Sequence, residues 1–137
     1  MPGDIFVDTS GFFALVVARD PHHGRCEELV RELRGRGGRA FTSEAIISET
    51  CTLLQARRQG HLIGGFLDYV DASRALRVLP CGTEMFQRAK DYLRRRCEHG
   101  FSFADCSSFL HMADLRLTDA LTTDEHFRIA GFHPMLC

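Results

Sequence analysis

The sequence lacks the marks of a membrane-spanning or secreted protein. No apolar run approaches the ~20 residues that are needed to cross a bilayer. No basic segment is followed by an apolar stretch and a small-residue cleavage site, as in a signal peptide. The six cysteines include no Cys-x-x-Cys pair and the seven histidines no His-x-x-x-His pair, so a tetrahedral zinc site has no paired ligands. We therefore expect a cytoplasmic protein with reduced cysteines and no membrane partner.

A strong charge of either sign is also missing. The formal net charge is −1 over 137 residues, so net charge alone does not indicate a nucleic-acid partner. Arginines cluster within residues 31–39 and 94–96, where they either contact phosphates or are exposed to solvent and favour helix ends. No linker, repeat or low-complexity segment divides the chain, and we expect one domain over residues 1–137.

Short apolar runs alternate along the chain with helical patterns. Runs at residues 5–7, 40–42, 76–79, 120–123 and 132–136 predict five strands. Helices between successive strands predict an α/β fold with a mainly parallel, about five-stranded sheet that carries helices on both faces.

One helix is predicted with its cap and its buried face. Thr83 is expected to cap it, because threonine accepts hydrogen bonds from the free amides of a first turn. Residues at helical spacing are expected to face the core: Phe86, Ala89, Leu93 and Cys97.

Two carboxylates follow predicted strands. Asp8 comes directly after residues 5–7, and Asp124 comes directly after residues 120–123. Open α/β sheets bind ligands at the carboxyl ends of their strands, so both positions favour a functional site. The alternative for Asp8 is structural, because Asp, Thr and Ser in sequence also cap helices and form turns.

Two further carboxylates lie on predicted helices. Glu49 falls within an apolar stripe of the helix that Ser43 is expected to cap, so it is expected to point inward unless the stripe is a boundary and the side chain extends to solvent. Asp105 lies in the first turn of the last long helix, three residues after Ser102. That spacing also fits a capping box, which needs no ligand.

These four carboxylates are predicted to converge on one edge of the sheet, since strand ends and the starts of the following helices meet there. Carboxylates that converge repel one another unless a cation lies between them. Oxygen ligands alone suit Mg²⁺ or Mn²⁺, which activate water and stabilise charge on a phosphoryl group. Hydroxyls of Thr9, Ser10 and Thr123 are placed to orient a water or a phosphate oxygen. The pattern therefore favours a metal-dependent phosphodiesterase.

The chain resembles PIN-domain ribonucleases in four successive segments: FVDTS at residues 6–10, TSEAIISE at 42–49, FAD at 103–105 and LTTDEHF at 121–127. Its compact form most resembles the VapC-type toxins of bacterial toxin–antitoxin pairs. Asp8, Glu49, Asp105 and Asp124 match the family's acidic positions, which implies that they are the catalytic and metal-binding residues. Thr9 matches a position that is usually Thr or Ser.

The resemblance also implies a three-layer α/β/α fold, Mg²⁺- or Mn²⁺-dependent cleavage of RNA and a homodimer. It further implies an antitoxin whose C-terminal segment covers the acidic cleft, and residues 61–70 present an apolar face for a partner. Two alternatives within the family are an RNA-processing nuclease outside a toxin–antitoxin pair and an RNA-binding module that does not cleave. A dehalogenase-like phosphatase is disfavoured, because Ser10 stands where its second aspartate is required.

Overall fold

The protein is described here by a computed structural model that covers residues 3–137. Strands and helices alternate in the order that the sequence pattern predicts. The strands are β1 (Ile5–Val7), β2 (Ala40–Ser43), β3 (Leu76–Leu79), β4 (Asp119–Leu121) and β5 (His133–Pro134). The α-helices are α1 (Thr9–Val16), α2 (His23–Gly35), α3 (Glu44–Ala56), α4 (Ile63–Ala72), α5 (Gly82–Arg95), α6 (Phe103–Asp114) and α7 (His126–Ile129). Two 3₁₀ turns, η1 (Gly60–Leu62) and η2 (Cys97–His99), precede α4 and α6.

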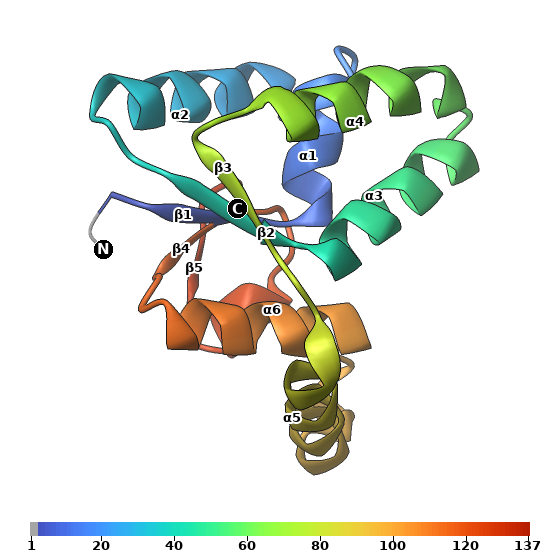
Figure 1. Cartoon of the computed structure of the whole chain (residues 1–137), viewed down its shortest axis with the longest axis vertical. Helices are drawn as coiled ribbons and strands as arrows, with labels where there is room; N and C mark the ends of the chain where they lie inside the picture. The colour runs from blue at the N-terminus through green and yellow to red at the C-terminus, as the bar shows by residue number, and fades with distance from the viewer. Residues whose placement is uncertain (1–2) are drawn as a thin grey trace.

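The five strands form one parallel sheet in the order β3-β2-β1-β4-β5. Helices α2 and α4 lie on one side of this sheet, and α5 and α6 lie on the other (Figure 1). The predicted α/β/α layering and five-stranded parallel sheet are therefore confirmed. Parallel strands need crossover connections, and helices supply each of them.

The central strand β1 is the point where the strand order reverses. The chain runs from β1 outward through β2 to β3, then crosses to β4 on the other side of β1. Val7 at the end of β1 pairs with Leu121 at the end of β4. In open α/β sheets the ligand crevice lies at such a reversal, outside the carboxyl ends of the strands. This rule favours a ligand site next to Asp8 and the residues after Leu121.

Aromatic side chains fill the core on both faces of the sheet. All three residues of β1 are buried, as expected of a central strand covered by helices on both sides. Phe12 of α1 meets Phe66 of α4 edge to face, with ring centroids 5.2 Å apart. On the other side Phe109 of α6 meets Phe127 of α7 in the same manner at 5.0 Å. Side chains from several crossovers thus hold β1 and β4 in place.

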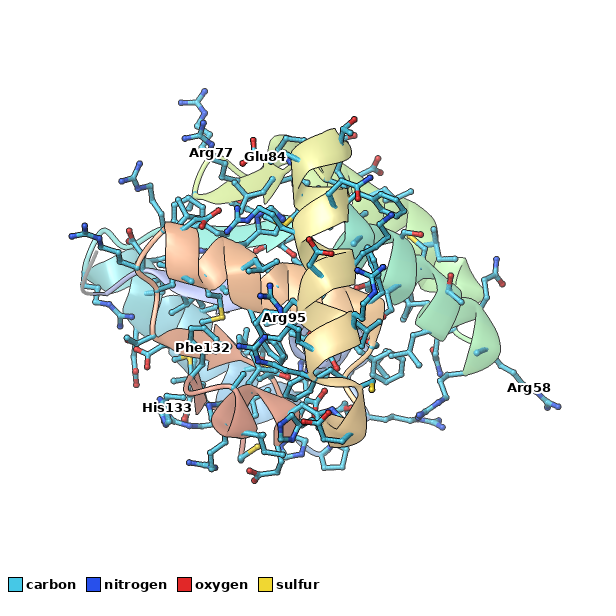
Figure 2. All side chains as sticks on the ribbon, turned by 90° about the horizontal axis from the view of Figure 1, so that it is seen from below. Arg58, Arg77, Glu84, Arg95, Phe132 and His133 are labelled. Atoms are coloured by element: carbon cyan, nitrogen blue, oxygen red, sulfur yellow. The ribbon has the colours of Figure 1, made fainter. Side chains whose placement is uncertain are left out.

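The predicted buried face of α5 is confirmed at Ala89 and at Leu93, which packs against the core, and is wrong at Phe86 and Cys97. Cys81 rather than Thr83 precedes the first helical residue. The buried residues are Met85 and Ala89, whereas Phe86 is 45% exposed and Cys97 is exposed. Helix α5 packs against α6, which it crosses in Figure 2. This contact buries Met85 in place of Phe86. No helix among residues 3–137 is both long and apolar enough to cross a membrane.

Gly11 allows α1 to lie against β4. A Cβ atom at this position would lie 2.2 Å from the carbonyl oxygen of Leu121. We expect Gly11→Ala to lower the free energy of unfolding by about 3 kcal/mol, because the added methyl must displace backbone rather than a flexible side chain. Chemical denaturation in EDTA measures this change.

The matched control for Gly11→Ala is Gly64→Ala in α4, where an added methyl would have no other atom within 4 Å. Alanine there is expected to leave stability unchanged or raise it by up to about 1 kcal/mol, since alanine favours a helix. Equal stability of the two variants would contradict the close approach of α1 and β4.

Candidate active site

Asp8 lies at the carboxyl end of β1 and is buried. Its side chain is 5% exposed, and its amide donates to the carbonyl of Leu121 across the ladder at 3.2 Å. Its Oδ2 accepts a hydrogen bond from Thr122 Oγ1 at 2.7 Å. Burial raises the pKa of Asp8 to about 7 and outweighs the bonds from Thr122 and the Thr9 amide; the charges of Asp105 and Glu49 raise it further. Asp8 is thus a carboxylate whose ionised form a nearby cation would stabilise.

A chain of hydroxyls orients the Asp8 carboxylate. Thr122 Oγ1 uses its single proton on Asp8, so the 3.1 Å contact with Ser10 Oγ is one in which Ser10 donates. Thr122 Oγ1 also accepts from the amide of Asp124 at 3.0 Å, and Ser10 Oγ accepts from the amide of Thr123 at 2.9 Å. These bonds tie the start of α1 to the segment after β4. Among the hydroxyls after β4, Thr122 contacts a carboxylate, and the role of Thr123 in orienting a water or a phosphate oxygen stays a prediction.

Asp105 forms the capping box that the sequence predicts for α6. Its Oδ2 accepts from the Ser102 amide at 3.0 Å, and its own amide donates to Ser102 Oγ at 3.0 Å. The residue is 8% exposed, and burial is the main cause that raises its pKa; Asp124 adds to the rise, whereas Ser102 and His126 lower it. Asp105 therefore caps α6 and also lies close to the other acidic side chains.

Asp124 and His126 complete the group on the β4 side. The Asp124 side chain is 33% exposed, and its Oδ1 accepts from the His126 amide at 2.8 Å. The ring Nδ1 of His126 lies 3.3 Å from that oxygen and 3.5 Å from Oδ2 of Asp105. One ligand atom from each of the three residues can be chosen so that all lie within 4.8 Å of one another.

Glu49 approaches the group from the surface. The expectation that it points into the core is wrong, because the residue is exposed, as in the boundary alternative. Its Oε1 nevertheless accepts from the buried Thr9 Oγ1 at 2.6 Å, across the contact between α1 and α3. Glu49 is also close enough to Asp8 for its charge to raise the pKa of that carboxyl. It thus borders Asp8, while Asp105, Asp124 and His126 form a group of their own.

The donor set fits a hard divalent cation. Raised pKa values of Asp8 and Asp105 mean that the acids lie in a region where negative charge is unfavourable, and a cation reverses that effect. Carboxylate oxygens are the usual protein ligands of Mg²⁺ and Mn²⁺. The arrangement can therefore hold a cation and, through it, a phosphate group at the sheet edge.

The sequence interpretation missed two of these side chains. Thr122 comes directly after β4. A hydroxyl at the end of a strand that neighbours Asp8 could have predicted a hydrogen bond to that carboxylate. His126 stands two residues after Asp124, and only the fold reveals that its ring turns back toward Asp105.

Comparisons with known proteins agree on one family. The PIN domain model matches residues 5–132. The chain is 34% identical over 128 residues to the 23S rRNA-specific endonuclease VapC20 of Mycobacterium tuberculosis, covering 93% of this chain and 95% of that protein. It is 29% identical over 115 residues to a VapC ribonuclease of Archaeoglobus fulgidus, covering 81% of this chain and 71% of that protein.

A solved structure has the same fold. The crystal structure of Mycobacterium tuberculosis VapC20, described as a Sarcin-Ricin loop cleaving toxin, superposes with a TM-score of 0.83 and 30% sequence identity. The match covers 94% of this chain and 96% of that one.

Proposed function

Because the chain belongs to the PIN-domain family, and within it to the VapC toxin ribonucleases, we propose that it hydrolyses RNA phosphodiester bonds with Mg²⁺ or Mn²⁺ as cofactor. The observation that carries this proposal is the buried Asp8 at the reversal of strand order, with Asp105, Asp124 and Glu49 around it. We propose that residues 1–137 act as one PIN domain in the cytoplasm, where RNA is available.

Asp8, Asp105 and Asp124 are the proposed ligands, and Glu49 is proposed to act at the border, directly or through water. A bound cation would neutralise the scissile phosphate and make a water more acidic. Thr122 holds the Asp8 carboxylate by a hydrogen bond, so one rotamer is ready before the cation arrives. The Ser102 amide does the same for Asp105, and Thr9 does so for Glu49. Positioning of this kind lowers the reorganisation that catalysis requires.

The proposed substrate is ribosomal RNA, because the relative that matches 93% of this chain is a 23S rRNA-specific endonuclease. The test is incubation of purified 23S rRNA with the protein and Mn²⁺, with cleavage sites mapped by primer extension. A single cut within the Sarcin-Ricin loop supports the proposal. Cuts elsewhere in the RNA would favour the alternative of an RNA-processing nuclease. Binding without cleavage would favour the alternative of an RNA-binding module that does not cleave.

The proposed antitoxin site includes an apolar groove between α1, α2 and α4. The groove has a volume of about 430 Å³, and its apolar lining includes Leu15, Val16, Val30, Leu62, Phe66 and Tyr69. It therefore includes part of the apolar face expected at residues 61–70. Three exposed charged residues, Arg31, Arg34 and Glu27, also line it, and their net positive charge suits an amphipathic segment that carries acidic residues. A homodimer is proposed as well, and light scattering of a strict monomer would contradict it.

Charge reversal at the groove tests this partner. The double variant Arg31→Glu/Arg34→Glu is expected to weaken antitoxin binding about 10-fold, because two favourable rim contacts become repulsive. The measurement is titration calorimetry with the product of the neighbouring small reading frame. The control Arg77→Glu changes an exposed arginine of β3, which projects into solvent in Figure 2, and is expected to bind as wild type. Equal affinity of all three proteins would contradict the groove.

A further inference from the structure

His126 places a ring nitrogen against two carboxylates. Its Nδ1 lies 3.3 Å from Oδ1 of Asp124 and 3.5 Å from Oδ2 of Asp105. The His126 side chain is 35% exposed, so the ring forms part of the mouth of the site rather than of the core. The only nitrogen donor in this group of ligand atoms is therefore directed at the two acids.

The spacing suits ligands of a single ion. Two atoms that ligate one octahedral ion of the Mg²⁺ size lie about 3 Å apart when adjacent and about 4.2 Å apart when opposite. The two nitrogen–oxygen distances, 3.3 and 3.5 Å, fall between these limits. One atom from each of Asp105, Asp124 and His126 can also be chosen with every separation below 4.8 Å. A cation can thus contact all three residues after small side-chain adjustments.

The surroundings hold the His126 ring with Nδ1 toward the acids. The ring packs edge to face on Phe101, with centroids 5.5 Å apart and planes at 85°. The backbone of His126 is fixed by the bond from its amide to Asp124 Oδ1. The other nitrogen, Nε2, lies on the Gly100 side, where a methyl on that glycine would be 3.8 Å away. Packing and backbone together therefore decide which nitrogen faces the site.

We propose that His126 Nδ1 is a further protein ligand of the divalent cation, beside Asp8, Asp105 and Asp124, and that it makes this centre favour Mn²⁺ over Mg²⁺. The inference rests on the proposed function, since it needs a cation at the acidic edge. Mg²⁺ is bound almost wholly through oxygen, whereas first-row transition ions accept imidazole nitrogen. Removing the nitrogen should therefore lower the affinity for Mn²⁺ more than the affinity for Mg²⁺.

The test is electron spin-echo envelope modulation of Mn²⁺ bound to the full-length protein, together with calorimetric titration of each ion. Wild type is expected to show a directly coordinated ¹⁴N. His126→Phe keeps a ring on Phe101 and removes the nitrogen; it is expected to lose this signal and at least about 10-fold in Mn²⁺ affinity. Its Mg²⁺ affinity is expected to change less than about 3-fold, since Mg²⁺ is held through oxygen.

His99→Phe is the matched control, because His99 also stacks on Phe101, at 5.3 Å, and is expected to keep the ¹⁴N signal. If His126→Phe does not fold, His126→Asn replaces the nitrogen with an amide and serves in its place. Mn²⁺ bound to wild type without coordinated ¹⁴N overturns the ligand role of His126 and leaves the proposed function standing. Wild type that binds neither ion overturns both.

Discussion

Asp8→Asn is expected to reduce the rate of RNA cleavage by at least about 10³-fold, as is typical when a central catalytic group is removed. The amide keeps the shape of the side chain and still accepts from Thr122, so the fold around it should persist. It loses the negative charge that is proposed to attract a cation to the carboxyl end of β1. Because cleft and substrate are both negative, productive binding of RNA should fail without that cation.

The matched control for Asp8→Asn is Asp4→Asn. Asp4 is also a buried aspartate, but it precedes β1 at the opposite end of the strand, where its Oδ1 accepts from the Arg39 amide at 2.8 Å. We expect this variant to cleave RNA at close to the wild-type rate. Single-turnover cleavage with Mn²⁺ compares the three proteins, and a wild-type rate in Asp8→Asn would contradict the assignment.

The stability of the metal-free protein is expected to fall as the pH rises from about 4 to above 7. Asp8 has a pKa of about 7 when folded and 3.8 as its ordinary value, so in this interval the folded protein holds a proton that the unfolded chain releases. The stability present at low pH is therefore lost as the pH passes through the folded pKa. The loss is at most about 4 kcal/mol, and the raised pKa of Asp105 acts in the same direction.

Denaturant unfolding in EDTA across this pH range measures the effect. His111 and Asp114 have lowered pKa values and oppose the trend, so the decisive quantity is the difference between wild type and Asp8→Asn. Above pH 7 the variant is expected to be the more stable protein without metal, and Mn²⁺ is expected to stabilise wild type far more than the variant. Parallel pH curves, or an equal Mn²⁺ effect in both proteins, would contradict a charged Asp8 at the metal site.

The sheet and the placement of Asp8 follow from local patterns, whereas Asp124 is expected directly after a strand and lies three residues beyond the end of β4 at Leu121. The apolar run Ile5–Val7 predicts a strand covered on both faces, and Asp8 follows it in the sequence as in the structure. Ser43 and Ser102 are predicted caps, and both accept hydrogen bonds from first-turn amides. These features depend on contacts within a few residues, which the sequence shows directly.

Side-chain direction across elements could not be predicted in the same way. Helix α5 buries Met85 in place of Phe86 because its packing partner is α6, which is distant in the pattern. Glu49 is exposed because its position on α3 borders solvent, although apolar residues flank it in sequence. His126 reaches Asp105 only because α7 contacts α6. Each of these depends on which long-range neighbour is present.

Cleavage of a synthetic Sarcin-Ricin-loop RNA, with products identified by mass spectrometry, tests the central claim most directly. The wild-type protein with Mn²⁺ is expected to cut the RNA by hydrolysis, in which water adds across the phosphodiester, so that products carry a phosphate monoester and a hydroxyl end. EDTA and Asp105→Asn are each expected to abolish these products. A 2′,3′-cyclic phosphate, which requires attack by the RNA's own hydroxyl, or cleavage that survives both EDTA and Asp105→Asn, would contradict a cation-dependent carboxylate centre.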